Sequence, residues 1–123
     1  MSLPTDSDCL DQPPVSTATF LGENTTFNCS IGDVNGDILW FVNNVYALSG
    51  PPEYGTSFMG SSTASCIKST LQMLAIEQTN NSQIQCAVFI NGELNRAYFP
   101  SPALLQVQGN SLRERYTKIN AIQ

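Results

Sequence analysis

The segment Thr25-Thr26-Phe27-Asn28-Cys29-Ser30-Ile31 alternates polar and apolar side chains and carries a cysteine among its apolar positions. Such alternation predicts a β-strand with one buried face. Trp40 follows Cys29 by eleven positions, inside the apolar run 38–42, and Cys86 follows Cys29 by 57 positions, inside the strand-like run 83–90. All three runs are short, which favours an all-β domain over long amphipathic helices.

Further short strands are expected at regular spacing, and this spacing is typical of a β-sandwich or barrel. Asn91-Gly92 is a strong signal for a two-residue hairpin turn after residues 83–90. Proline cannot donate to a sheet ladder, so Pro100 and Pro102 should interrupt the returning strand. The remaining expected strands are 15–21, 45–48, an edge strand near 56–59, 69–76, 94–99 and 103–108.

One domain is expected, because 123 residues suffice for a single core but not for two. Residues 1–14 are polar, end in Pro13-Pro14 and are expected to be an extended lead-in. Residues 15–109 form the predicted domain, and 110–123 are expected to be a linker or tail.

The formal charge of −5 is unevenly distributed. Three of the five basic residues, Arg113, Arg115 and Lys118, lie near the end of the chain, so the domain itself is strongly acidic. An acidic surface repels phosphate backbones and anionic lipids, so we expect neither a nucleic-acid partner nor direct membrane contact. No stretch approaches the ~20 apolar residues of a membrane-spanning helix.

The cysteines form an even set, Cys9, Cys29, Cys66 and Cys86. The chain has no Cys-x-x-Cys pair and no histidine, which argues against zinc, and we expect no metal or cofactor. Two disulfides are the simplest interpretation, and they indicate an extracellular compartment. Three glycosylation sequons, beginning at Asn24, Asn28 and Asn80, indicate the same compartment.

The order and spacing of Cys29, Trp40 and Cys86 resemble the pattern of the immunoglobulin superfamily. The resemblance implies a Greek-key β-sandwich of two sheets, in which the two cysteines bridge the sheets and the tryptophan packs against the bridge. It also implies that Leu71, Met73 and Ile76 are core positions of the strand and turn that precede Cys86 by about ten to fifteen residues.

The sequence departs from the family pattern at Ile84, where the family usually carries the tyrosine of its tyrosine corner. We therefore expect a divergent member. The gap between Cys29 and Cys86 is short for a full variable-type domain and long for the most compact types, so a variable or intermediate type is expected. In the family, strands A and E flank strand B in parallel, and Cys9 and Cys66 lead into those strands. A second disulfide between them is implied; pairing of either cysteine with another chain or domain is the alternative.

No catalytic site is expected, since the chain has no histidine to act as a general base and no Gly-x-Ser-x-Gly motif.

The polar loop 33–37 resembles the start of a calcium-binding loop, but Ile38 and Asn44 stand where such a loop needs glycine and an acid. A sialic-acid receptor of this family would carry an arginine on the strand of Cys86, and residues 83–90 contain none. Arg96 lies on the next strand and is expected to be solvated.

One predicted sheet face is unusually apolar. With Trp40 and Cys86 pointing inward, alternation turns Leu39, Phe41, Ala87 and Phe89 outward. Further aromatic residues that could extend this face are Tyr46 and either Tyr98 or Phe99. Exposed contiguous apolar surface commonly marks an interface, although the segment 49–65 or a neighbouring domain could cover it.

We therefore expect an extracellular recognition module of a cell-surface or secreted protein, binding another protein or itself through the face of the family's strands G, F, C and C′. The hairpin tip 90–94 could also contact a partner. An architectural spacer within a longer ectodomain is the alternative. A cytosolic muscle-type domain is a third possibility, against which the cysteines and sequons argue.

Overall fold

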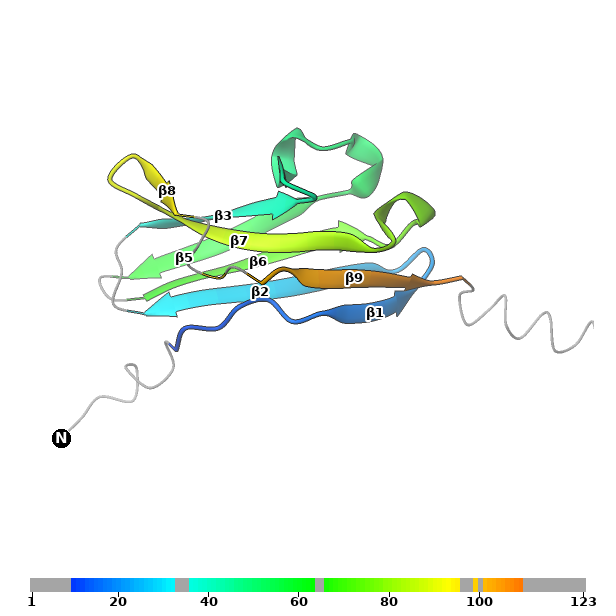
Figure 1. Cartoon of the computed structure of the whole chain (residues 1–123), viewed down its shortest axis with the longest axis horizontal. Helices are drawn as coiled ribbons and strands as arrows, with labels where there is room; N and C mark the ends of the chain where they lie inside the picture. Colours follow the sequence, from blue (N-terminus) through cyan, green and yellow to red (C-terminus); the bar gives the residue numbers. More distant parts are fainter. Residues whose placement is uncertain (1–9, 33–35, 64–65, 96–98, 100, 110–123) are drawn as a thin grey trace, which may run out of the picture.

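The computed structural model describes residues 10–32, 36–63, 66–95, 99 and 101–109 (Figure 1). Within these ranges the chain forms nine strands along the long axis of the molecule. The strands are β1 (Thr17–Phe20), β2 (Asn24–Gly32), β3 (Asp37–Val42), β4 (Val45–Tyr46), β5 (Ser57–Thr63), β6 (Cys66–Leu74), β7 (Ser82–Ile90), β8 (Glu93–Asn95) and β9 (Ala103–Gln108).

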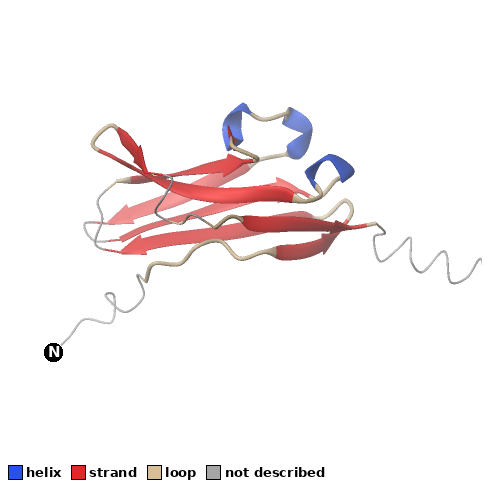
Figure 2. Ribbon diagram, viewed as in Figure 1, coloured by secondary structure: helices blue, strands red, loops and turns tan. Residues whose placement is uncertain are grey.

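The strands divide into two sheets that pack against each other. A six-stranded sheet has the order β1-β9-β7-β3-β4, with β8 also paired to β7, and a three-stranded sheet has the order β2-β6-β5. Short 3-10 turns at Ala47–Ser49, Pro52–Tyr54 and Glu77–Thr79 lie in the connections (Figure 2). The predicted fold class, an all-β Greek-key sandwich of two sheets, is confirmed.

The chain enters the sandwich through a segment that touches both sheets. Gln12 forms an isolated antiparallel bridge with Ser30 of β2. After the buried Pro14, the chain passes to the six-stranded sheet, where β1 pairs in parallel with β9. The expected lead-in is thus hydrogen-bonded to the sheet from Leu10 onward, while residues 1–9 lie outside the described residues.

Strands β5 and β6 are longer than the sequence predicts. The run Ser57-Phe58-Met59-Gly60-Ser61-Ser62-Thr63 has the composition of a loop, yet all seven residues pair with β6. Pairing with a neighbouring strand outweighs the weak local preference of Gly and Ser. Strand β6 begins at Cys66 rather than at Ser69, because residues 66–68 pair with both β2 and β5.

Two hairpin turns use residues with positive φ. Asn91 and Gly92 have φ of 53° and 80°, which confirms the predicted two-residue turn between β7 and β8. Asn43 and Asn44, with φ of 52° and 67°, join β3 to β4 in the same way. The Oδ1 atom of Asn43 accepts a hydrogen bond of 2.8 Å from the backbone N–H of Gln83, which ties this turn to β7.

The core lies between the sheets. Trp40, Leu71 and Met73 are all fully buried in it. Ile76, which the sequence register predicts for the core, is only half-buried, because Ala75 continues the inward alternation of Leu71 and Met73.

Candidate binding face

The centre of the sandwich is a disulfide between the two sheets. Cys29 of β2 is bonded to Cys86 of β7, with a Cα–Cα distance of 6.5 Å. Trp40 of β3 lies directly opposite Cys86 in the strand register, and its side chain is fully buried. The cysteines and the tryptophan thus join three strands from both sheets at one place.

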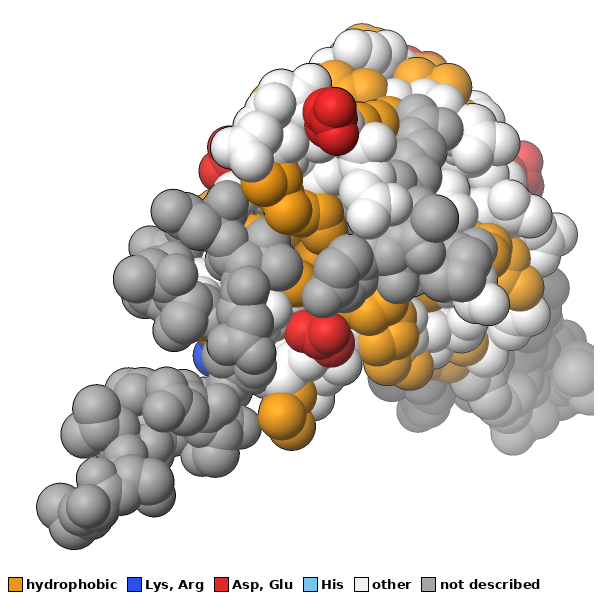
Figure 3. All heavy atoms as spheres, turned by 60° about the vertical axis from the view of Figure 1, so that its left-hand side comes forward, with side chains coloured by type: hydrophobic (Ala, Val, Ile, Leu, Met, Phe, Trp, Pro, Cys, Tyr) orange, Lys and Arg blue, Asp and Glu red, His pale blue; other side chains and the backbone are white. Residues whose placement is uncertain are grey.

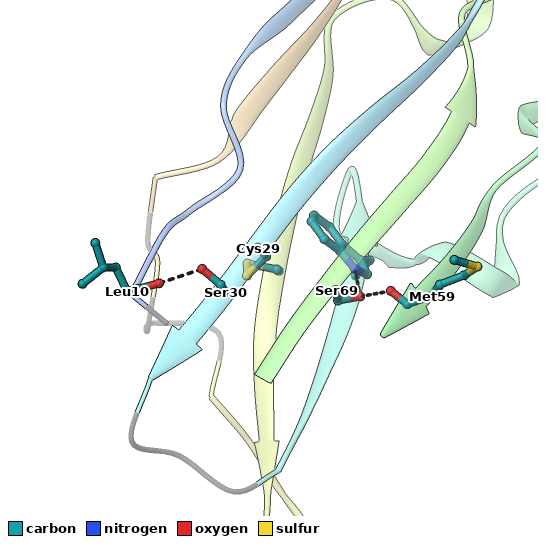
Figure 4. The surroundings of a disulfide bond; sticks show 7 residues. Leu10, Cys29, Ser30, Met59 and Ser69 are labelled. Atoms are coloured by element: carbon teal, nitrogen blue, oxygen red, sulfur yellow. Dashed lines mark hydrogen bonds between the residues drawn. A yellow bond between two sulfur atoms is a disulfide. The ribbon is translucent and has the colours of Figure 1, made fainter. Parts of the chain in front are cut away.

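A buried hydrogen bond accompanies this centre. The indole N–H of Trp40 donates to the Oγ of Ser69 over 2.7 Å, and Ser69 lies opposite Cys29 in the register of β2 and β6. The Ser69 hydroxyl in turn donates to the carbonyl oxygen of Met59 on β5 over 3.2 Å (Figure 4). Buried N–H groups need such a partner, so the indole N–H is satisfied inside the core.

Cys66, at the start of β6, is also disulfide-bonded, and no cysteine among the described residues is free. Its predicted partner, Cys9, lies outside the described residues. Leu10, the first described residue, is held against β2 because its carbonyl oxygen accepts a hydrogen bond of 2.6 Å from the Ser30 hydroxyl (Figure 4).

The predicted binding residues that the structure describes lie on strands of the six-stranded sheet: Leu39 and Phe41 on β3, Tyr46 on β4 and Phe89 on β7. Core side chains of β3 and β7 alternate with outward ones, and the outward row contains Leu39, opposite Ala87, and Asp37, opposite Phe89. Leu94 of β8 lies opposite Phe89. We refer to this side of the sheet as the outer six-stranded face.

Exposure on this face differs from the sequence expectation. Phe41 is only 5% exposed, because Tyr46 lies opposite it on β4 with the two ring centroids 6.1 Å apart. Tyr46 is itself half-buried and meets the ring of Phe58, on the other sheet, at 6.3 Å between centroids. Ala87 is also buried. Phe41 and Tyr46 therefore close one edge of the sandwich instead of forming an open contact surface.

The sequence pattern allows either Tyr98 or Phe99 to extend this face. Phe99, the alternative to Tyr98, packs against the core. Tyr98 and Arg96 lie outside the described residues, as do residues 33–35 of the polar loop.

The open apolar part of the face lies at the β7–β8 hairpin. Phe89 is 38% and Leu94 40% exposed, and the two are direct cross-strand neighbours. The half-buried Leu39 is the diagonal neighbour of Phe89 on β3. We call these three residues the hairpin patch; Figure 3 turns its end of the molecule forward and shows hydrophobic side chains among polar and acidic ones.

Leu94 belongs to this patch, although the sequence pattern places it in the hairpin tip and at the start of the expected strand 94–99 and does not assign it to the apolar face. The signal was present: a two-residue turn at Asn91-Gly92 pairs Ile90 with Glu93, and therefore Phe89 with Leu94. Alternation then places Leu94 on the same side as Phe89.

A groove of about 320 Å³ lies between the sheets beside β3. It exists because β4 pairs only with the last two residues of β3, which leaves the first half of β3 without a neighbour on that side. Its lining comes from β3, β5 and β6 and includes Ile38, Phe58 and Lys68.

The described residues contain no group of three or more His, Cys, Asp or Glu side chains that could hold a metal ion. Likewise, no helix in the described ranges is long and apolar enough to cross a membrane.

All three sequon asparagines are exposed. Asn24 and Asn28 are both on β2, on the outward side of the three-stranded sheet. Asn80 lies in the turn before β7, where its Oδ1 accepts a hydrogen bond of 2.8 Å from the backbone N–H of Val107. The Asn80 side chain thus has a structural contact, and its glycosylation stays a prediction.

The fold and its central bridge define a disulfide-linked all-β sandwich of two sheets. Neither the protein-family models nor the curated proteins that were compared with the chain gave a match.

Proposed function

We propose that the chain is a divergent immunoglobulin-superfamily domain and an extracellular recognition module that binds a protein partner through the hairpin patch. The module belongs to a cell-surface or secreted protein and serves adhesion or immune-type recognition, with another protein or a second copy as its partner.

Two observations support the family. The cross-sheet disulfide Cys29–Cys86 has Trp40 beside it, which is the arrangement that the family resemblance implies. The parallel pairing of β1 with β9 and the presence of the short β4 beside β3 support a variable or intermediate type.

The cysteines support the extracellular assignment. Cys29, Cys66 and Cys86 are all disulfide-bonded. Disulfides persist in oxidising compartments and are rare in the cytosol, where thiols are kept reduced. The acidic body of the domain and the lack of histidine in the chain favour protein recognition over nucleic-acid binding or acid-base catalysis.

The hairpin patch is the observation that carries the binding proposal. Phe89 and Leu94 are large, apolar and more than one third exposed, and they adjoin each other on a two-stranded hairpin. Aromatic residues such as Phe89 are enriched in the apolar core of protein interfaces, which a polar rim surrounds, and Leu94 enlarges the apolar surface beside Phe89. Asp37, which lies opposite Phe89 on β3, supplies an acidic group beside the patch, which fits a partner with a basic residue next to an apolar centre.

The test is a binding screen of the full chain, produced by secretion and displayed as a multimer, against arrayed cell-surface ectodomains and against itself. The double variant Phe89→Ser with Leu94→Ser removes the patch. We expect it to weaken the affinity for any partner found by about tenfold or more, because loss of interface anchors commonly costs more than 1 kcal/mol each.

A matched control is Met59→Ser, which removes an apolar side chain that is 78% exposed on the other sheet. The control variant should bind like the wild type. Equal binding of the double variant and the wild type would show that the patch is not the contact surface.

An architectural spacer is the second candidate. It is favoured by the path of the chain, because the described part begins at one end of the long axis and ends at the other (Figure 1). Further immunoglobulin-like repeats on both sides of the chain in its gene, together with no partner in the screen, would favour the spacer over recognition.

A further inference from the structure

The outer side of the three-stranded sheet differs in chemistry from the outer six-stranded face. Its outward side chains are mainly short and polar, and the one charge that they carry in the described residues is that of Lys68. Other members are Thr26, Thr70, Gln72, Ser57 and Ser61. We call this surface the polar face. Its large apolar exceptions are Met59, with 78% exposure, and the half-buried Leu74, which lies opposite Asn24.

Two sequons lie on the polar face. Asn24 and Asn28 are four residues apart on β2, so both point outward on the same side at a separation of about 13 Å along the strand. Both are exposed. Asn28 accepts a hydrogen bond of 2.7 Å from the Thr70 hydroxyl through its Oδ1 atom. Because N-glycosylation modifies the Nδ2 atom and keeps the carbonyl oxygen, a sugar is compatible with this bond.

We propose that Asn24 and Asn28 both carry N-linked glycans and that these glycans close the polar face to protein partners. The proposal rests on the extracellular location proposed above, because the modification takes place in the secretory pathway. It adds to the recognition proposal by assigning the two faces opposite roles.

The modification requires a lipid-pyrophosphate-linked oligosaccharide as donor. A bond forms between Asn Nδ2 and the anomeric carbon of the first sugar, while the bond from that carbon to the pyrophosphate oxygen breaks. The lipid pyrophosphate leaves, and the amide group loses one proton. No oxidant or reductant is needed.

The dimensions of the sheet explain why two glycans suffice. Three strands at a spacing of about 4.8 Å span roughly 10 Å between the outer strands, and nine residues span about 30 Å. Two glycans about 13 Å apart on one strand therefore stand over most of this area. A protein partner, which typically needs ~800 Å² on each side, could not lie flat on the polar face without meeting them.

The strand register also accounts for the exposed methionine. Asn28, Thr70 and Met59 form one row across β2, β6 and β5. Met59 is thus about 10 Å from Asn28, within reach of the first sugars. A glycan at Asn28 would cover an apolar side chain that the protein itself leaves open.

The first part of the test is site occupancy. The full chain is secreted from eukaryotic cells, and the peptides that contain Asn24 and Asn28 are analysed by mass spectrometry before and after enzymatic removal of glycans. We expect modification at both sites. Thr26→Val should abolish modification of Asn24, whereas the control Thr26→Ser should keep it. Asn28→Asp should remove the second glycan while keeping an oxygen for Thr70. Secreted protein with Asn24 or Asn28 unmodified would overturn the proposal.

The second part tests closure with a defined probe. Single-domain antibodies are selected on bacterially produced, unglycosylated protein, and those whose binding is lost with Met59→Lys are kept as probes of the polar face. We expect the secreted, glycosylated protein to bind them at least a hundredfold more weakly and enzymatic deglycosylation to restore binding. Undiminished binding to the glycosylated protein would overturn closure.

The two proposals fail separately. Unmodified asparagines together with partner binding that depends on Phe89 and Leu94 would remove only the glycan proposal. Modified asparagines together with partner binding that is insensitive to those two residues would remove only the hairpin patch.

Discussion

The indole N–H of Trp40 has Ser69 as its hydrogen-bond partner inside the core. We predict that Ser69→Ala lowers the free energy of unfolding by about 1–3 kcal/mol, because the substitution leaves a buried donor without an acceptor. Urea unfolding followed by tryptophan fluorescence measures this directly, since Trp40 is the one tryptophan of the chain.

Ser61→Ala is the control, because Ser61 is an exposed serine on the neighbouring strand β5. It should change stability by no more than about 0.5 kcal/mol. Equal unfolding midpoints for Ser69→Ala and the control would mean that the hydrogen bond does not contribute to stability.

Individual residues also differ in whether their role could be predicted from the sequence. Cys29, Trp40 and Cys86 could be assigned because each is rare and lies in a recognisable strand. Ser69 could not, because nothing in the sequence tells which serine reaches the indole until the register of β6 is known. The turn before β7, in a domain that lacks the tyrosine corner, is a similar case. It contains a buried Thr79, whose hydroxyl accepts a hydrogen bond of 2.9 Å from the backbone N–H of Ile76, and the sequence alone did not predict this bond.

The approach of β3 to β7 depends on a glycine just before β3. A Cβ atom at Gly36 would lie 2.6 Å from the carbonyl oxygen of Phe89 and 2.9 Å from the Cγ1 atom of Ile90. Because the first contact is with backbone, β3 and the end of β7 would have to separate. We predict that Gly36→Ala destabilises the domain by about 1–3 kcal/mol, as overpacked substitutions do, with the loss measured by thermal unfolding.

Gly109→Ala is the comparison for this substitution, since a Cβ atom at Gly109 meets nothing within 4 Å. Its melting temperature should equal that of the wild type. A Gly36→Ala variant as stable as Gly109→Ala would show that the two strands can separate at little cost.

At the level of strands, the alternation of apolar and polar residues correctly predicted which way side chains point, but it did not predict how exposed they are. Leu39, Phe41 and Phe89 all have the predicted outward register. Whether an outward side chain is exposed to solvent depends on its neighbours across the sheet. Phe41 is covered by Tyr46, and the two residues meet because of the two-residue turn at Asn43-Asn44. The pairing of β1 with β9 could not be predicted from the sequence either, because β1 is short and lies more than 80 residues from its partner.

The bridge between the sheets acts on the whole molecule, because it closes a loop of 57 residues. We predict that the double variant Cys29→Ala with Cys86→Ala loses about 4 kcal/mol of stability, since the unfolded chain gains conformational freedom. Urea unfolding without reductant measures this loss while Cys66 keeps its own disulfide. An unfolding midpoint equal to that of the wild type would contradict the prediction.

The parallel pairing of β1 with β9 has a mechanical consequence. The described chain enters at one end of the long axis and leaves at the other (Figure 1). Tension between these ends therefore pulls β1 and β9 in opposite directions along their own axes. The four residue pairs from Thr17 with Leu105 to Phe20 with Gln108 are then loaded together, in shear, and cannot open one after another. In a chain under load, this short ladder would bear force before the core is exposed.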